Sequence, residues 1–333
     1  MAEEDPVVKP PGFAPRLALW IELSRPFTLL PPLLGMLTGA LTALGAVRFR
    51  SGLSAREAAL AAVDGGVLGP ILLGAVFAAA MNAASNALNQ VTDIENDRVN
   101  KPSRPLPSGR VSAREAILLS IALYALSLAA AAMIRPGGRI DTLVVAAGGA
   151  LLSIVYSVPP FRTKRHGTGA NLTIAAARGC LLKVCGWSLV APVFSDPEPW
   201  WIGGIFMLFL IGAATTKDFA DIPGDRAAGC NTWPVAYGPR RAAAMVAPFL
   251  IVPWILIPVG ALLPGPGREH LLSGRFGVFL LVAAGLAIYG AVTARSILAD
   301  PDALATTENH PSWTHMYRQM MLAQIGTAAA YWI

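Results

Sequence analysis

The chain has 333 residues, of which 54% are apolar and only 14% are charged, and its mean hydropathy is +0.54. Soluble globular domains carry about 25% charged residues, so this composition excludes an ordinary soluble domain. The net charge of +6 does not indicate a nucleic-acid partner, because the basic residues lie in short loops between apolar blocks. Three cysteines and four scattered histidines provide neither a disulfide framework nor a zinc or haem site.

The apolar residues form blocks of about 18 to 25 residues, a length that crosses the ~30 Å hydrocarbon core of a bilayer as a helix. The expected fold is all-α, a polytopic membrane bundle of about nine transmembrane helices in a single domain over residues 1–333. The predicted spans are 17–47, 67–92, 113–134, 140–158, 171–194, 200–216, 242–264, 276–298 and 316–333.

Residues 1–16 form an acidic, proline-containing tail in which no cleavable signal is expected. Lysine and arginine concentrate in this tail and in the second, fourth and sixth loops between the spans. By the positive-inside rule, the N-terminus and these loops face the cytoplasm. We therefore expect a multi-pass integral membrane protein with the lipid bilayer as a partner.

One short motif occurs twice, each time directly after an apolar span. Asp93-Ile94-x-x-Asp97-Arg98 in the second loop recurs as Asp221-Ile222-x-x-Asp225-Arg226 in the sixth. Such a repeat indicates two related helical halves that present equivalent acidic ends to one shared site. The alternative is chance similarity of six residues.

The acidic residues of each copy follow helical spacing. One row has the pattern i, i+4, i+8 and the other i, i+3, i+7, so each row would gather its oxygen atoms on one helix face. The candidate metal ligands are Asn89, Asp93, Asp97, Asp218, Asp221 and Asp225. Oxygen ligands without histidine or cysteine select a hard ion, and Mg²⁺ commonly combines one or two carboxylates with substrate phosphates. The alternative for a single copy is a solvated helix end.

The same loops carry the positive charge that a diphosphate would need. The candidate diphosphate ligands in them are Arg98, Lys101, Arg104, Arg162, Lys164, Arg165, Lys217 and Arg226. Arg25 lies early in the first span, where its side chain could reach either a phosphate or the membrane surface. Arg178 and Lys183 lie inside the fifth span, where charge is costly; one is expected to face the site and the other to pair with lipid headgroups.

These motifs resemble those of the UbiA superfamily of intramembrane prenyltransferases. The matching pieces are SRPFTLLPPLLG at 24–35, NQVTDIENDRVNKPSRPLPSG at 89–109, YSVPPFRTKRHG at 156–167 and KDFADIPGDRAAGCNTWPVAYG at 217–238. The resemblance implies a nine-helix bundle around a central cavity that opens sideways to lipid and is capped by the even loops. Asn89-Gln90 replaces the common Asn-Asp, and Pro160 stands where a lysine often follows Tyr156. Both departures are similar to the homogentisate and chlorophyll-synthase branch.

The resemblance also implies roles for matching residues. Asn89, Asp93, Asp97, Asp221 and Asp225 would hold Mg²⁺ and the diphosphate, with Asp218 nearby. Arg25, Arg104, Lys164 and Lys217 would contact diphosphate oxygens, and Tyr156 would lie close to the allylic carbon. Asp93, Asp97, Asp221, Asp225 and Tyr156 are accordingly the catalytic candidates.

The expected function is Mg²⁺-dependent transfer of a prenyl group from a prenyl diphosphate to an aromatic acceptor. The allylic diphosphate would ionise and the acceptor ring would capture the cation. The alternatives on the same scaffold are cyclisation of the prenyl chain and transfer to a lipid hydroxyl, a sugar or a porphyrin side chain. A transporter is a remote alternative, because the charges concentrate at span ends instead of in the middle of broken spans.

Overall fold

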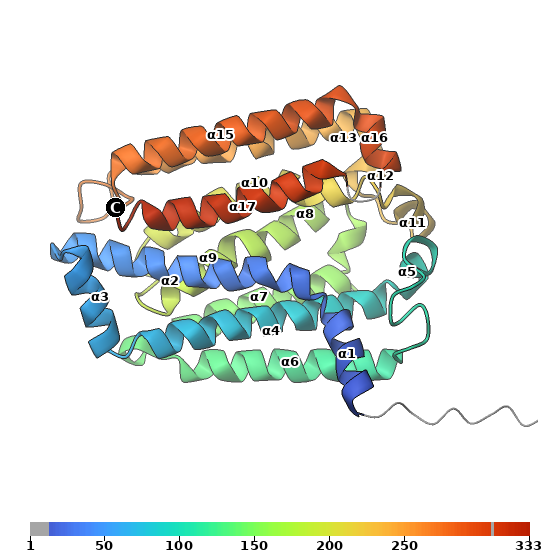
Figure 1. Ribbon diagram of the computed structural model, residues 1–333, viewed down its shortest axis with the longest axis horizontal. Coiled ribbons are helices and arrows are strands. Elements are labelled where there is room, and N and C mark those ends of the chain that lie inside the picture. The colour runs from blue at the N-terminus through green and yellow to red at the C-terminus, as the bar shows by residue number, and fades with distance from the viewer. Residues whose placement is uncertain (1–12, 308–309) are drawn as a thin grey trace, which may run out of the picture.

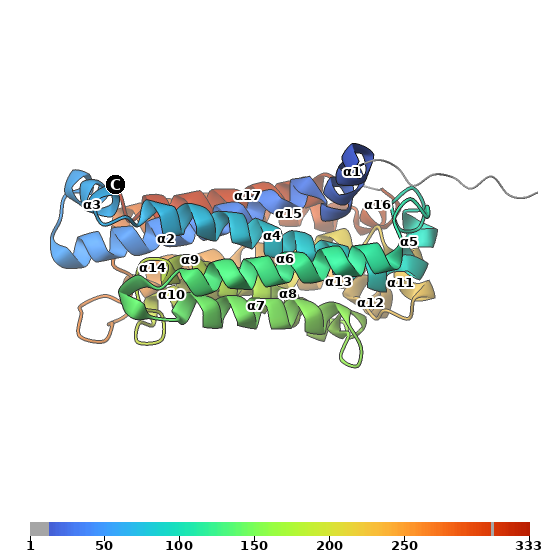
Figure 2. The same ribbon diagram turned by 90° about the horizontal axis from the view of Figure 1, so that it is seen from below.

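The computed structural model describes residues 13–307 and 310–333, and these residues contain only helices and loops. The unbroken long helices are α2 (Leu30–Ser51), α4 (Leu68–Thr92), α6 (Ala113–Met133), α7 (Asp141–Ser157), α10 (Glu198–Ala213), α15 (Phe276–Ala299) and α17 (Pro311–Ala329). They run roughly parallel to one axis and form a single bundle (Figures 1 and 2).

Two further segments cross the bundle as broken helices. The first consists of α8 (Thr168–Ala175), a π-helical turn at Ala176–Leu181 and α9 (Leu182–Ser188). The second consists of α13 (Pro239–Val246), two 3₁₀ turns at Ala247–Leu250 and Val252–Ile255, and α14 (Leu256–Gly260). The short helices are α1 (Phe13–Ser24), α3 (Ala55–Asp64), α5 (Ile94–Asn100), α11 (Ile222–Ala227), α12 (Trp233–Tyr237) and α16 (Pro301–Thr306), and further 3₁₀ turns occur at Pro26–Leu29, Pro136–Gly138, Thr163–Arg165 and Ala214–Lys217.

Six helical segments are long and apolar enough to cross a membrane. They are Pro26–Ser51, Leu68–Thr92, Ala113–Met133, Glu198–Lys217, Pro239–Gly260 and Phe276–Ala299, and Asp141–Ser157 is a shorter apolar helix. Large apolar side chains such as Leu72, Leu126 and Leu281 are 64–74% exposed on the outside of the bundle. Such a surface suits lipid and would cause aggregation in water. The polytopic all-α prediction is thus confirmed, while the count of nine spans and the relation between two halves stay predictions.

The first span begins later than predicted. Residues 17–47 do not form one helix, because Arg25 has φ +55° and breaks the chain between α1 and the turn that leads into α2. Helix α1 instead packs against α4 and α6, where Trp20 Nε1 donates to Glu115 at 2.7 Å. Most of the predicted tail 1–16 lies outside the described residues. Arg25, predicted to lie within the first span, therefore lies immediately before it, since the span begins at Pro26.

Small residues allow close packing in the middle of the bundle. A Cβ atom on Gly39 of α2 would lie 3.0 Å from the Cα of Gly186 in α9, so the two backbones are nearly in contact. Such contacts are typical of helices in lipid, where association depends on van der Waals packing more than on the hydrophobic effect.

The C-terminus lies at one end of the bundle (Figure 1), and a network of charged and polar side chains includes Tyr331 near it. Its centre is Glu198, at the start of α10, whose side chain has no exposed surface. Its carboxylate accepts hydrogen bonds from the Tyr331 hydroxyl at 2.5 Å and from Ser273 N and Oγ at 2.6 and 2.9 Å. It also forms ion pairs with Arg50 and Arg268. We call Arg50, Asp196, Glu198, Arg268, Ser273 and Tyr331 the Glu198 network.

Candidate active site

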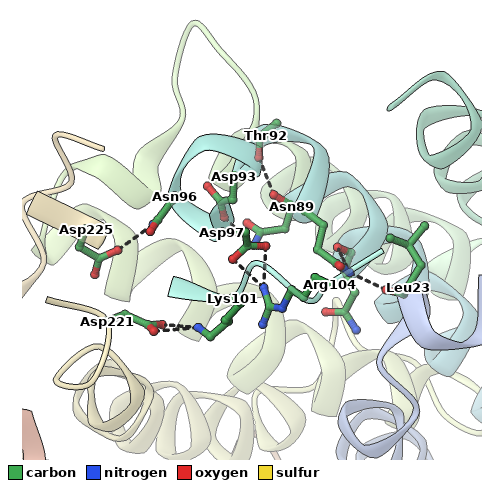
Figure 3. Close-up of polar contacts among 12 residues, drawn as sticks. Leu23, Asn89, Thr92, Asp93, Asn96, Asp97, Lys101, Arg104, Asp221 and Asp225 are labelled. Carbon is green, nitrogen blue, oxygen red and sulfur yellow. Dashed lines mark hydrogen bonds and ion pairs between the residues drawn. The ribbon is translucent and has the colours of Figure 1, made fainter. Parts of the chain in front are cut away.

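The two acidic motifs lie side by side at the opposite end of the bundle. Asp93 immediately precedes α5, and Asp221 immediately precedes α11. Helices α5 and α11 contact each other and are neighbours in both views (Figures 1 and 2). Lys101 Nζ, beside the first motif, contacts the Asp221 carboxylate at 2.7 and 3.0 Å, and Asn96 Nδ2 donates to Asp225 Oδ1 at 3.2 Å (Figure 3). Two segments far apart in the sequence therefore meet at one site.

Basic residues hold the carboxylates of the first motif. Asp93 accepts a hydrogen bond from Asn89 Nδ2 at 2.8 Å and forms an ion pair with the buried Lys164. Arg104 Nη1 contacts both carboxylate oxygens of Asp97, at 2.8 and 2.7 Å (Figure 3). Burial lowers the pKa of Lys164, although the Asp93 carboxylate acts in the opposite direction. Each contact neutralises part of a charge that would otherwise be costly to bury.

The second motif is less well compensated. Burial raises the pKa of Asp218 to about 8; Lys217 opposes this rise, and the carboxylates of Asp225 and Asp221 add to it. Burial and the neighbouring Asp221 likewise raise the pKa of Asp225 to about 6. Closely spaced carboxylates resist ionisation in this way until a cation joins them. The loop of the second motif is therefore an environment that favours binding of a positive ion.

The donor set fits magnesium only as part of a ternary site. Among the residues that the structure describes, no three acidic, histidine or cysteine side chains are close enough together to bind a metal ion alone. Mg²⁺ needs few protein ligands, because it keeps several waters and takes the rest from substrate phosphates. Lys101, Arg104 and Lys164, which now pair with carboxylates, carry the nitrogen donors that suit phosphate oxygens. The residues thus fit a magnesium site that a diphosphate completes.

A polar cavity of about 590 Å³ lies between the two motifs, and we call it the aspartate cavity. An apolar pocket of about 80 Å³ adjoins it deeper in the bundle, with walls that include Met36, Phe77 and Leu181. The residues that line both spaces are Ser85, Tyr156, Ile174 and Arg178. A polar chamber therefore adjoins an apolar one, and Tyr156 lies in the wall of both, at their junction.

Three cations in the wall of the aspartate cavity differ from the other basic residues there in their hydrogen bonds and ion pairs. The side chains of Arg25, Arg178 and Lys217 form no hydrogen bond or ion pair with any residue that the structure describes, whereas Lys101, Arg104 and Lys164 all pair with aspartates. We call Arg25, Arg178 and Lys217 the free cations. Uncompensated positive charge at a membrane-embedded cavity favours an anionic ligand.

Comparison with known proteins agrees with this geometry. A model of the UbiA prenyltransferase family matches residues 52–306. The chain belongs to this family. Over 193 residues it is 34% identical to the bacteriochlorophyll synthase 33 kDa chain of Cereibacter sphaeroides, covering 56% of this chain and 61% of that relative. Over 274 residues it is 31% identical to the digeranylgeranylglyceryl phosphate synthase of Methanopyrus kandleri, covering 81% of this chain and 89% of that one.

The fold is also that of solved UbiA proteins. A UbiA homolog from Archaeoglobus fulgidus, solved bound to DMAPP and Mg²⁺, matches with a TM-score of 0.66 at 22% identity, covering 94% of this chain and 98% of that chain. The apolar helices and the family together identify an integral membrane protein.

Most residues proposed for the UbiA-type site lie around the aspartate cavity. Its lining includes Arg25, Asn89, Asp93, Asp97, Lys101, Arg104, Tyr156, Lys164, Lys217, Asp218, Asp221 and Asp225. Arg162 is not in the lining and lies behind it, 3.6 Å from Asp93. Arg98 does not line the cavity either. It lies on the exposed face of α5, and its guanidinium pairs with Glu95 at 2.8 Å.

Two residues of this UbiA-type site were not singled out as ligands from the sequence. Asn96 joins the two motifs through Asp225, and the only sequence signal for it is its position inside the first motif. Arg178 was recognised as an intramembrane charge, but nothing in its spacing identifies it as a residue of both chambers. Both depend on contacts between distant parts of the chain.

Proposed function

We propose that this protein transfers a prenyl group from a Mg²⁺-bound prenyl diphosphate to an aromatic acceptor, with the aspartate cavity at the cytoplasmic end of the bundle. The observation that supports this most strongly is that a polar and an apolar chamber adjoin each other and share part of their walls. The polar one has both acidic motifs in its wall, and it joins the apolar one at Tyr156. A prenyl diphosphate has the same two parts, a charged head and an apolar chain, joined at the carbon that reacts.

The head group would bind between the two acidic loops. Bound Mg²⁺ supplies positive charge that stabilises the diphosphate as it leaves. Asp93, Asp97, Asp221 and Asp225 would hold the ion, with Asn89 and Asp218 beside them. Arg25 and Lys217 would donate hydrogen bonds to the diphosphate oxygens, joined by Lys101, Arg104 and Lys164 once these leave their carboxylate partners.

The reaction would take place at the junction. The allylic C–O bond breaks and its electron pair leaves with the diphosphate, so positive charge develops on the prenyl chain beside Tyr156. An aromatic ring near such a cation stabilises it by roughly 0.5–2 kcal/mol, and the apolar walls exclude water that would capture it. An electron-rich carbon of the acceptor then forms the new C–C bond. The proton that this carbon loses passes to a carboxylate of the second motif.

The test uses purified full-length protein in detergent. It would be incubated with MgCl₂, prenyl diphosphates of several chain lengths and a panel of hydroxylated aromatic acids, and products would be read by mass. We expect one acceptor to gain the mass of a prenyl group while diphosphate is released, only when Mg²⁺ is present. Failure of every prenyl diphosphate to react, or reaction independent of the divalent ion, would contradict the proposal.

A second candidate is transfer to a hydroxyl group of a phosphorylated glycerol lipid. It is favoured by the similarity to digeranylgeranylglyceryl phosphate synthase, which extends over 81% of the chain. Adding geranylgeranylglyceryl phosphate to the acceptor panel separates it from the aromatic proposal. A reaction with prenyl diphosphate alone separates cyclisation from both, because a cyclised product forms without any acceptor.

A further inference from the structure

Arg178 lies inside the membrane bundle at the junction of the two chambers. It belongs to the π-helical turn Ala176–Leu181 between α8 and α9, and it lines both the aspartate cavity and the apolar pocket. The other residues that line both chambers, Ser85, Tyr156 and Ile174, carry no charge at neutral pH. Arg178 is therefore the one cation of the described residues that reaches both the polar and the apolar chamber.

Close helix packing fixes the π-helical turn in place. Gly179, next to Arg178, lies against the backbone of α10, and a Cβ atom at this position would lie 2.7 Å from both N and Cα of Met207. Gly203 of α10 packs in the same way on Cys180. A π turn inserts an extra residue into a helix and is frequent at functional sites. The turn is thus held firmly while its arginine lines the chambers.

The other intramembrane cation of this segment is fully accommodated by the protein. Lys183 Nζ donates to Thr38 Oγ1 at 2.6 Å and lies 4.6 Å from the centre of the Phe206 ring. It is buried in the bundle and lines neither chamber, so it does not reach lipid headgroups. Arg178, five residues earlier, has no such partner among residues 13–307 and 310–333. This segment therefore provides a hydrogen-bond acceptor and an aromatic ring for the cation of Lys183, but not for that of Arg178.

An unpartnered guanidinium at this depth favours an anion, and its place suggests which one. The aspartate cavity already offers the diphosphate Arg25, Lys217 and the two acidic loops, none of which lines the apolar pocket. The acceptor must reach the allylic carbon, which would lie at the junction itself, beside Tyr156. An acidic group on the acceptor would thereby come within reach of Arg178, whose planar guanidinium can bind a carboxylate or phosphate through two hydrogen bonds.

We propose that Arg178 binds the ionised carboxylate or phosphate of the acceptor and so orients the acceptor toward the allylic carbon. This inference rests on the proposed function and adds that the acceptor is an acid. It assigns Arg178 to acceptor binding and leaves the diphosphate to Arg25 and Lys217.

The test compares acceptors that differ only in the acidic group. Hydroxylated aromatic acids are paired with their methyl esters, and geranylgeranylglyceryl phosphate is paired with the alcohol that lacks the phosphate. With wild-type protein we expect kcat/KM to be at least about tenfold higher for the acid of the reactive pair, since a hydrogen bond to a charged group contributes about 1.5–3 kcal/mol. Which pair reacts distinguishes a carboxylate from a phosphate acceptor.

Variants then test whether Arg178 is responsible for the preference for the acidic acceptor. Arg178→Met should raise KM for the acid about tenfold or more, leave the ester or alcohol nearly unchanged and keep KM for the prenyl diphosphate within about twofold. Arg178→Lys should recover part of the preference. Arg25→Met is the matched control, which should raise KM for the prenyl diphosphate and keep the preference for the acid. If Arg178→Met does not fold, Arg178→Gln is carried through the same comparison.

Two results would overturn the inference while the proposed function stands. One is a wild-type enzyme that uses acid and ester equally well. The other is an Arg178→Met variant that loses prenyl diphosphate affinity as Arg25→Met does, because this would make Arg178 a diphosphate ligand. Absence of any prenylated product with wild-type protein would instead reject the proposed function, and the inference with it.

Discussion

The two ends of the bundle both bury charged groups, and they do so in opposite ways. In the Glu198 network the central carboxylate receives hydrogen bonds or ion pairs from four other residues. Burial alone would raise the pKa of Asp196, but hydrogen bonds from Arg268 and the Glu198 N–H and the charge of Arg50 hold it below its usual value. At the aspartate cavity, burial raises the pKa of Asp218 to about 8, and the free cations form no hydrogen bond or ion pair within the described part of the chain.

The comparison distinguishes two kinds of buried charge: charges that stabilise the fold by pairing with each other, and charges that a ligand would pair. A buried ion pair with complete hydrogen bonding is expensive to break from one side, so it fixes the structure around it. Charges left incompletely paired around a cavity reduce stability, and they persist where a ligand completes them. The Glu198 network accordingly joins α2, α10 and the C-terminus, whereas the aspartate cavity is prepared for a cation and an anion together.

The largest expected effect follows from removing one carboxylate of either motif. Asp93→Asn or Asp221→Asn should lower kcat by about 100-fold or more, because each removes a charged ligand of the proposed Mg²⁺–diphosphate site. The thermal unfolding midpoint in detergent should fall only where a buried cation loses its counter-charge, as Lys164 does in Asp93→Asn. Asp302→Asn, at an exposed ion pair with Arg240, is the matched control and should leave both unchanged. Near-normal turnover in either motif variant would remove the metal-site argument.

At the Glu198 network we expect a substitution to reduce stability and to leave turnover nearly unchanged. Glu198→Gln should destabilise the protein by about 3–5 kcal/mol, because it leaves Arg50 and Arg268 without a full counter-charge. Thermal unfolding in detergent measures this loss, and turnover per folded molecule should remain close to wild type. A variant with normal unfolding and reduced turnover would show that the Glu198 network takes part in catalysis.

A smaller effect is expected where a cavity cation is removed. Arg104→Ala should raise KM for the prenyl diphosphate about tenfold, the loss expected for one charge-assisted hydrogen bond. The same change leaves Asp97 without its partner, so Arg104→Lys serves as the control that keeps the charge. Unchanged KM in the alanine variant would assign Arg104 to holding Asp97 alone.

The smallest effect is expected from pH. The raised pKa values of Asp225, about 6, and Asp218, about 8, mean that protons compete with Mg²⁺ below these values. The Mg²⁺ concentration for half-maximal activity should therefore fall several-fold between pH 6 and 8. Without Mg²⁺ the unfolding midpoint should fall over the same range, because a carboxyl whose pKa is raised in the folded state destabilises that state as it ionises. A pH-independent Mg²⁺ requirement would contradict this.

Much of the site could be predicted from the sequence because its signals are local. Helical spacing predicted that Asn89, Asp93 and Asp97 lie together, although a turn at Asp93 separates α4 from α5. The repeated motif indicated that Asp221 and Asp225 share their site. The structure places all of them around one cavity. The apolar blocks likewise predicted the helices, since hydrocarbon thickness fixes their length.

The parts that could not be predicted depend on tertiary contacts. The sequence gives no reason for Lys101 to pair with Asp221 of the other motif instead of with Asp97, its near neighbour. Glu198 resembles an ordinary loop acid, and its hydrogen bond with Tyr331 joins residues far apart in the chain. The break at Arg25 depends on a left-handed backbone conformation that apolar periodicity does not encode.

The central claim is that both acidic motifs bind one Mg²⁺–diphosphate together. The most direct measurement is a structure of the full-length protein with Mn²⁺ and a non-reactive prenyl thiolodiphosphate, with the ion located by anomalous scattering. We expect metal density between the Asp93 and Asp221 loops, with both loops in contact with the same diphosphate. Metal and diphosphate bound to one loop only, or at separate places, would contradict it.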